Sequence, residues 1–283
     1  MLVAAESSSV NLYNFALFAA QTGRPGEVLR ASEQVDVEDL LIRIWPDYWT
    51  QEAKAHYWLS QYEEGLETAR AGTQRFPENL PLRRREIQAL IALGRLEEID
   101  PLLDDLETME PVGSSSPGWM FRLVSGDLAR FGHTSESRAI AERAVEWYQA
   151  RDPDAYQRPT AQALILAGRA EEAMEIIGPL AEERPDSLRD HGIHSIALAL
   201  TGDTTGAESK AAWFEALDRP YMFGENTYWR AAILSHLGRL DEAVILLRQA
   251  YREGRGRDAM HYDPNLMPLW DHEQYEQFIA PRG

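Results

Sequence analysis

The chain of 283 residues contains no cysteine, which excludes disulfides, thiolate metal sites and a cysteine nucleophile. β-Branched residues are also few, because 9 Val, 14 Ile and 11 Thr stand against 36 Ala and 32 Leu. This balance favours helix over strand. No apolar run approaches the roughly 20 residues that a bilayer-spanning helix needs. We therefore expect a largely helical protein without a membrane span.

Basic residues are scarce as well. The sequence has 28 Lys and Arg against 46 Asp and Glu, a net charge of −18. A field of this sign repels phosphate backbones and anionic lipid headgroups, so nucleic acid and membrane surfaces are excluded as partners. The first fifteen residues lack the basic start and the cleavage site of a secretory signal. We expect a cytoplasmic protein, or a fragment of a larger cytoplasmic chain.

The sequence also lacks the motifs of common enzymes: a Gly-rich phosphate loop, a Gly-x-Ser-x-Gly elbow and a His-Glu-x-x-His helix. Paired carboxylates do occur, at Glu63-Glu64, Glu97-Glu98, Glu171-Glu172 and Asp241-Glu242. They recur where a second helix of a repeat is expected to begin, and acids there favour the helix dipole. We interpret them as structural and expect no catalytic residues.

Two histidines raise the question of a metal site. His191 and His194 are spaced i, i+3 with Asp190 adjacent, so their side chains could share a helix face. No recognisable motif nearby supplies a third and fourth ligand. We expect neither a metal nor a cofactor.

Acidic residues at a position of the repeat where an apolar residue is expected support an alternative prediction, that the protein is an enzyme. Glu52 lies four residues before His56, and Glu86 occupies the position of Glu52 one unit later. Such acids could mark a catalytic or ion site in an internal groove. The structural interpretation is that they pair with Lys54, Arg83 or neighbouring Arg residues.

An internal repeat of about 34 residues organises the chain. Residues 46–79 align without a gap on residues 80–113, so that Ser60 falls on Gly94. Successive spacings of the recurring turn are 37, 34, 38, 36, 34 and 36 residues. The turns are expected at Gly23, Ser60, Gly94, Gly132, Gly168, Gly202 and Gly238.

The repeat resembles the tetratricopeptide repeat, most clearly in the segments 167–173 (Ala-Gly-Arg-Ala-Glu-Glu-Ala) and 237–243 (Leu-Gly-Arg-Leu-Asp-Glu-Ala). Small residues stand where the two helices of each unit would cross closely, since larger side chains would hold the backbones apart. These are Ala16, Ala53, Ser125, Ala161, Ser195 and Ala231 in first helices, and Gly65, Ser137, Ala173, Ala207 and Ala243 in second helices. The resemblance implies an all-α superhelix, a solenoid of about seven helix pairs. The rival all-helical architecture is an (α/α) toroid.

The chain after the seventh unit has a different pattern. We expect a repeat domain over residues 9–257 and a C-terminal capping segment over 258–283, which covers the last apolar face. Asp263-Pro264 predicts a turn, and Asp271 followed by Gln274 predicts the capping box of a short helix. The segment 263–283 resembles the ending of tetratricopeptide domains at the C-terminus of bacterial signalling proteins. This implies, as one alternative, a regulatory domain of such a protein.

First-helix positions that would line the concave groove carry the functional prediction. Counting five residues into each unit places Arg84, Arg122 and Arg158 in one row, a local reversal of charge in an acidic chain. Arg offers a planar fork to carboxylates. The full predicted groove consists of Lys54, Tyr57, Trp58, Arg84, Arg85, Gln88, Trp119, Arg122, Arg158 and Gln162.

The pattern of this row is similar, in part, to the carboxylate clamp of chaperone-binding tetratricopeptide proteins, with Gln88 and Gln162 in place of Asn. The resemblance implies a non-catalytic protein–protein interaction module that binds an acidic peptide or extended segment in its groove. A hydrolase or metal-dependent enzyme with its site in the groove is the alternative from another class.

Overall fold

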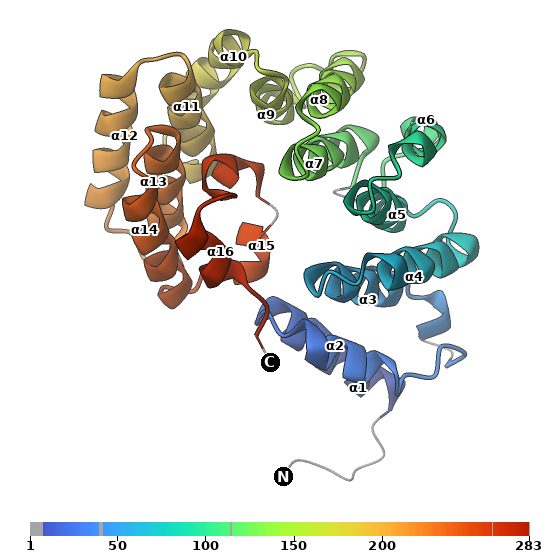
Figure 1. Cartoon of the computed structure of the whole chain (residues 1–283). Coiled ribbons are helices and arrows are strands. Elements are labelled where there is room, and N and C mark those ends of the chain that lie inside the picture. The colour runs from blue at the N-terminus through green and yellow to red at the C-terminus, as the bar shows by residue number, and fades with distance from the viewer. Residues whose placement is uncertain (1–7, 40–41, 114, 262, 283) are drawn as a thin grey trace. The chain divides into compact units, whose positions relative to one another are not determined.

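The computed structural model describes residues 8–39, 42–113, 115–261 and 263–282. Its contacts divide the chain into two compact units, residues 1–120 together with 281–283, and residues 121–280. We call them unit 1 and unit 2. Both consist of helices joined by short connections (Figure 1). The described residues contain no strand, only an isolated bridge between Val112 and Ser115.

Unit 1 holds three helix pairs, and each helix packs against the helix before it. The apolar residues of these helices form its core, for example Leu82 and Leu103, which are fully buried. Its elements are α1 (Ser9–Gln21), α2 (Pro25–Ser32), η1 (Ile42–Ile44), α3 (Asp47–Trp58), α4 (Tyr62–Arg75), α5 (Leu80–Ala92), η2 (Leu96–Glu98) and α6 (Ile99–Thr108).

Unit 2 holds four helix pairs and the C-terminal segment, and α7 begins in the last residues of unit 1. From α8 to α14 consecutive helices are in contact, and the first helix α11 also touches the first helices α9 and α13. Its elements are α7 (Pro117–Arg130), α8 (Thr134–Gln149), α9 (Gln157–Ala167), α10 (Ala170–Glu183), α11 (Leu188–Leu200), α12 (Thr204–Ala216), α13 (Glu225–His236), α14 (Leu240–Arg252), α15 (Arg257–His261), η3 (Pro264–Leu269) and α16 (Glu273–Ile279). None of the described helices is both long and apolar enough to cross a membrane.

The turn within every pair lies at the residue that the repeat predicts. All seven turn residues adopt a left-handed backbone, for example Gly168 with φ 82°. Glycine has no Cβ to clash there, so it is the favoured residue. Ser60 is the one non-glycine in the set, with φ 57°. The predicted all-α arrangement of tetratricopeptide-like helix pairs is therefore confirmed.

An ion pair marks the start of several second helices. The turn glycine is followed by Arg, whose guanidinium pairs with a Glu three residues later, as in Arg239–Glu242 at 2.6 Å. Arg169–Glu172 and Arg95–Glu98 repeat the pair at 2.6 Å. Such exposed pairs contribute little to stability, about 0–1 kcal/mol each. They give one carboxylate in three of the four recurring pairs, at Glu98, Glu172 and Glu242, a structural role at a helix start.

Small residues occupy the helix crossings, as predicted. All eleven predicted crossing residues are buried. At the α7–α8 crossing the hydroxyl of Ser137 donates a 2.8 Å hydrogen bond to the backbone carbonyl of Ser125. At the α3–α4 crossing a Cβ on Gly65 would lie 3.5 Å from the backbone carbonyl oxygen of Ala53. These contacts set the close approach of the two helices in each pair.

The C-terminal segment lies beside α13 and α14 (Figure 1) and also reaches back to α7. A Cβ on Gly126 of α7 would lie 3.1 Å from Pro264, and the guanidinium of Arg130 lies 5.9 Å from the ring of Trp270. The segment buries Leu266, Leu269 and Tyr275 completely. It thus covers a face of several pairs within unit 2, in addition to the last one.

Two local expectations for this segment differ in outcome. Asp263 begins η3 as predicted, since its carboxylate accepts a 3.0 Å hydrogen bond from the backbone N–H of Asn265. The capping box of Asp271 and Gln274 is wrong. Helix α16 begins at Glu273 after His272, and no side chain caps it. The adjoining turn explains the shift, because the N–H of His272 is bonded to the carbonyl of Leu269.

Candidate functional site

The predicted groove residues of unit 1 lie on α3, α5 and the start of α7. Most of them are buried side chains: Gln88 is 1% exposed, Arg84 is 5% exposed and Trp58 is 8% exposed. They contact one another, as the Nζ of Lys54 lies 4.8 Å from the Trp58 ring and Arg85 donates a 2.6 Å hydrogen bond to Gln88. These residues offer little free surface to a ligand. The others of this set are Tyr57, which is buried, and Trp119, which is half-buried.

In unit 2 the structure brings two predicted groove residues together and separates the third. Arg122 of α7 and Gln162 of α9 line the same cavity, of about 380 Å³. Arg158, also on α9, is not among its lining residues. Its guanidinium instead donates two hydrogen bonds to the carboxylate of Asp190 on α11.

The cavity is walled by first helices and closed by the C-terminal segment. Apolar side chains form most of the wall, among them Ile165 of α9, Ile196 of α11 and Met267 of η3. The start of α8 contributes Thr134 and Arg138 to the same wall. Enclosed apolar surface with a few convergent polar groups is the usual build of a ligand site.

Arg122 is the less exposed of the two arginines that line this cavity, since Arg138 is exposed. It makes no hydrogen bond and no ion pair with any other described residue. Burial lowers the pKa of the Arg122 guanidinium, and the nearby Asp263 opposes the lowering. The Asp263 oxygens are taken by other donors, the hydroxyl of Tyr228 and the amide of Asn265. Because arginine stays protonated in proteins, the cavity holds a cation whose hydrogen-bond donors are available.

Two further polar groups of the cavity, His236 and Ser137, have protein partners. The Nε2 of His236 donates to the backbone carbonyl of Asn265 at 3.1 Å. Burial lowers the pKa of His236 to about 4, so the ring is neutral at pH 7. Ser137 donates to the carbonyl of Ser125. The arrangement can bind an anion, and Ser137 and His236, each bonded to a backbone carbonyl, are not paired as nucleophile and general base.

Neither of the acids that favoured an enzyme is among the lining residues of this cavity. Glu86 is paired with Arg70 at 3.1 Å and with Arg83 at 3.2 Å. This confirms the structural interpretation that the sequence offered for Glu86. Burial raises the pKa of the Glu52 carboxyl, and the neighbouring His56 opposes the rise.

His191 has protein partners, whereas the Nδ1 of His194 has none among the described residues. The Nε2 of His191 donates to the backbone carbonyl of Pro185 at 3.2 Å, and its Nδ1 lies 3.4 Å from the Nζ of Lys210. The His191 ring also packs on Trp213, with 4.7 Å between centroids. Within the described part of the chain no three His, Asp or Glu side chains are grouped to hold a metal ion.

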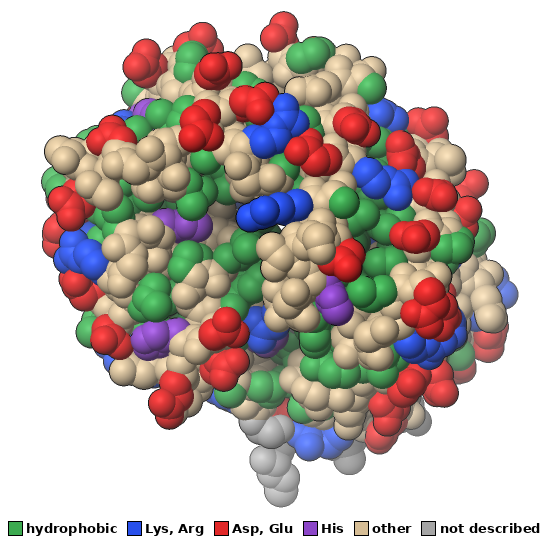
Figure 2. Space-filling model, turned by 45° about the horizontal axis from the view of Figure 1, so that its top comes forward, with side chains coloured by type: hydrophobic (Ala, Val, Ile, Leu, Met, Phe, Trp, Pro, Cys, Tyr) green, Lys and Arg blue, Asp and Glu red, His purple; other side chains and the backbone are tan. Residues whose placement is uncertain are grey.

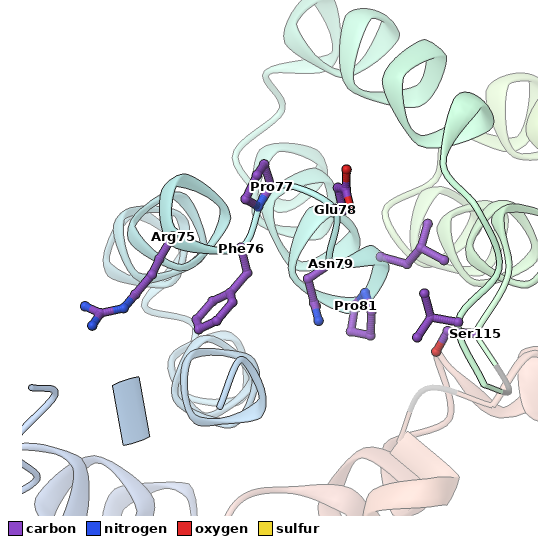
Figure 3. Close-up of a pocket in the computed structure, with 9 residues that line it drawn as sticks. Arg75, Phe76, Pro77, Glu78, Asn79, Pro81 and Ser115 are labelled. Carbon is purple, nitrogen blue, oxygen red and sulfur yellow. The ribbon is translucent and has the colours of Figure 1, made fainter. Parts of the chain in front are cut away.

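A more open depression of about 430 Å³ lies in unit 1, at the connection from α4 to α5. Figure 3 shows Phe76 and Asn79 at this depression, while Arg75 points away from Asn79. Arg75 is engaged elsewhere, by Glu38 at 3.1 Å. None of the predicted groove residues lines this depression.

The face of the molecule seen in Figure 2 agrees with the net charge of −18. Figure 2 shows acidic side chains spread over one face, with hydrophobic side chains between them. Sequence reasoning found Arg122 and Gln162 from the repeat register, but it missed His236 and Asn265. Asn265 enters the site only because the C-terminal segment folds back, and the repeat pattern carries no signal for that.

Comparisons with known proteins concern the fold. No protein-family model matches the chain, and no curated protein matches it either. Among solved structures, it is similar to a tetratricopeptide repeat protein from Parabacteroides merdae, at 12% identity and a TM-score of 0.47, over 92% of this chain and 98% of that one. It is also similar to the structure of Naa15/Naa10 bound to HypK-THB, at 19% identity and a TM-score of 0.35, over 93% of this chain and 39% of that one. At these TM-scores neither structure bears on the function.

Proposed function

We propose that the chain is a non-catalytic protein–protein interaction module, and that unit 2 holds an acidic peptide whose carboxylate binds at Arg122. The observation that carries this proposal is the Arg122 guanidinium, which lines a cavity together with Gln162 and lacks a partner among the described residues. A peptide from another protein would supply the missing carboxylate. The proposed binding surface is therefore this one cavity, which is smaller than the concave groove that the sequence predicts.

The energetics favour an anionic occupant. A cation removed from water without a partner is costly, and a carboxylate that pairs with it recovers much of that cost. A bidentate Arg–carboxylate pair is among the stronger hydrogen-bonded contacts in proteins. Gln162 adds neutral donors and acceptors beside it. The apolar wall around Ile165 and Ile196 would contact the side chain that carries or adjoins the carboxylate.

Binding rather than catalysis is supported by the state of the other polar groups. His236 is neutral and donates to Asn265, and Ser137 is bonded to the backbone of α7. Neither is paired with the other as nucleophile and base. The second predicted cation, Arg158, is neutralised by Asp190 and leaves the binding role to Arg122.

The test is a titration of a fluorescein-labelled acidic peptide with a free C-terminal carboxylate, followed by fluorescence anisotropy. Arg122→Gln should weaken binding by about tenfold or more, since a charge-assisted hydrogen bond contributes about 1.5–3 kcal/mol. Arg252→Gln, on the exposed end of α14, removes the same charge outside the cavity and should change binding less than about twofold. Equal affinity of wild type and Arg122→Gln would refute the proposal.

A further inference from the structure

A second depression of unit 2 lies on the side of the second helices, away from the Arg122 cavity. It measures about 470 Å³ and is bordered by α12 on one side and by α14 on the other. Helix α13 contacts both and forms the floor with Leu234. We call this depression the α12–α14 groove. The apolar part of its lining is Ala211, Ala212, Leu234, Ile245 and Leu246.

Ile245 breaks the repeat at this groove. It lies two residues after the small crossing residue of its helix, at a position that points to solvent in the second helices. Its side chain is 62% exposed although it is large and apolar. The equivalent positions in other units are also exposed but are polar or small: Glu67, Ala139, Glu175 and Ser209. A large apolar side chain therefore replaces the usual residue only where the groove runs beside it.

The charges at the rim leave an unpaired carboxylate. Arg230 pairs with Glu215 at 2.8 Å, and Arg239 pairs with Glu242 at 2.6 Å. Both cations of the lining are therefore neutralised within the chain. Glu208, the remaining charged residue of the lining, has no hydrogen bond or ion pair with a described residue, although its charge helps to raise the pKa of the nearby Arg239. The groove thus combines an apolar floor with a negative rim, in a chain of net charge −18.

We propose that the α12–α14 groove docks an amphipathic helix of a partner protein, with Lys or Arg beside its apolar stripe. A helix fits because the groove walls are two helices, and helices pack at about 8–10 Å from their neighbours. Apolar residues of the partner at i, i+3 or i+4, and i+7 would cover Ile245 and Leu246. A basic residue at the edge of the stripe would pair with Glu208. This surface is independent of the proposed peptide site, with which it shares no lining residue.

The probe is a synthetic peptide of about 18 residues, long enough to form a helix in isolation. It carries Leu along one stripe, Lys beside the stripe and Ala elsewhere, and binding to the full chain is followed by fluorescence anisotropy. Ile245→Glu and Glu208→Lys should each weaken binding by about tenfold or more, because hot-spot contacts at helix grooves have this size. Ile245 and Glu208 are exposed, so both variants should fold. Ala139→Glu places the same charge at the equivalent position of α8, and it should leave affinity within about twofold.

Three results would overturn the proposal. The first is the absence of binding of the Lys peptide to the wild type. The second is equal binding of a peptide in which Glu replaces every Lys, because charge complementarity with Glu208 would then be irrelevant. The third is self-association of the wild type in sedimentation experiments that Ile245→Glu abolishes, since the occupant of the groove would then be a second copy of this chain.

Discussion

Arg158 and the buried Asp190 form an ion pair between two consecutive first helices of unit 2. The Nε and Nη2 of Arg158 donate to the two carboxylate oxygens of Asp190, and the Asp190 side chain has no exposed surface. Burial alone would raise the pKa of the Asp190 carboxyl, but hydrogen bonds from Arg158 and Ser187 hold it below its usual value. The pair links α9 to α11, so Arg158 has a structural role in this fold.

Replacing Arg158 by Ala should destabilise the protein by about 2–4 kcal/mol, because the charge of Asp190 would remain buried with a weaker partner. The guanidinium of Arg184, 4.0 Å from Asp190, would compensate only in part. Urea denaturation at pH 7 measures the loss, and the double variant Arg158→Met, Asp190→Leu should recover most of it. A change in the free energy of unfolding below about 0.5 kcal/mol would contradict the buried pair.

Replacing Arg122 is expected to change the free energy of unfolding in the opposite direction, although Arg122 occupies the same position of the repeat as Arg158. Arg122→Met removes a cation that has no partner among the described residues and adds apolar contact in the cavity. The free energy of unfolding should rise by about 1–2 kcal/mol, while acidic peptide binding is lost. Thermal unfolding of Arg122→Met beside Arg252→Met checks the effect against a surface arginine. A lower melting temperature for Arg122→Met would mean that the wild-type cation is already satisfied.

These two arginines show how far the sequence alone predicts the site. The repeat register places Arg122 and Arg158 at equivalent positions of their first helices, three residues before the buried crossing residues Ser125 and Ala161. The register does not predict which residue of the following unit pairs with each arginine. In the unit that follows Arg158, the residue two positions before the arginine row is Asp190. In the unit that follows Arg122, the equivalent residue is Tyr156, which cannot form an ion pair. Asp190 is an acid at an otherwise uncharged position of the repeat, and this was the available signal of the ion pair. From the sequence, Asp190 was considered only as a neighbour of His191 and His194.

The fold was more predictable than the site, for a physical reason. Turn residues and helix crossings depend on local chemistry, such as the left-handed backbone at Gly168 or the close contact at Ala173. Short segments of the sequence are enough to predict such local features. The cavity depends on η3, which folds back more than 130 residues along the chain to contact Gly126. No periodic pattern encodes a contact of that separation. His236 and Asn265 therefore became part of the site only in the folded structure.

A test of the packing between first helices uses Gly192 of α11. A Cβ at this position would lie 2.1 Å from the indole of Trp229 on α13, so the ring rests directly on the glycine. Gly192→Ala should destabilise by about 1–3 kcal/mol through overpacking, despite the better helix propensity of Ala. Gly178→Ala on α10 is the matched control, since its Cβ would meet nothing closer than 3.8 Å. The control should be neutral or stabilising by up to about 1 kcal/mol. Equal effects in urea unfolding would contradict the α11–α13 contact.

The helix crossings predict a similar loss at Ala173 and Ala243. Both side chains are fully buried where the second helix meets the first helix of its pair. Substitution by Leu in either helix should lower the free energy of unfolding by about 1–3 kcal/mol, because the added atoms force the two backbones apart. Ala139→Leu, at an exposed position of α8, should change it by less than about 0.5 kcal/mol. Unchanged melting temperatures for both core variants would show that the repeat register is misassigned.

His236 should make stability depend on pH. Burial lowers its pKa to about 4 in the fold, whereas an unfolded histidine titrates near about 6.5. Between these values the unfolded chain binds the extra proton, so the free energy of unfolding falls as pH is lowered from about 6.5 to about 4. At pH 5 the loss due to His236 should be about 2 kcal/mol relative to pH 7.

The Nε2 of a Gln can still donate to the carbonyl of Asn265, so His236→Gln keeps this contact and removes the titration. Urea unfolding of both proteins at pH 7 and pH 5 gives the difference directly, with the carboxylates common to the two cancelling. Parallel losses in wild type and His236→Gln would mean that the histidine is solvated in the fold, and the cavity would then be wetter than its apolar wall implies.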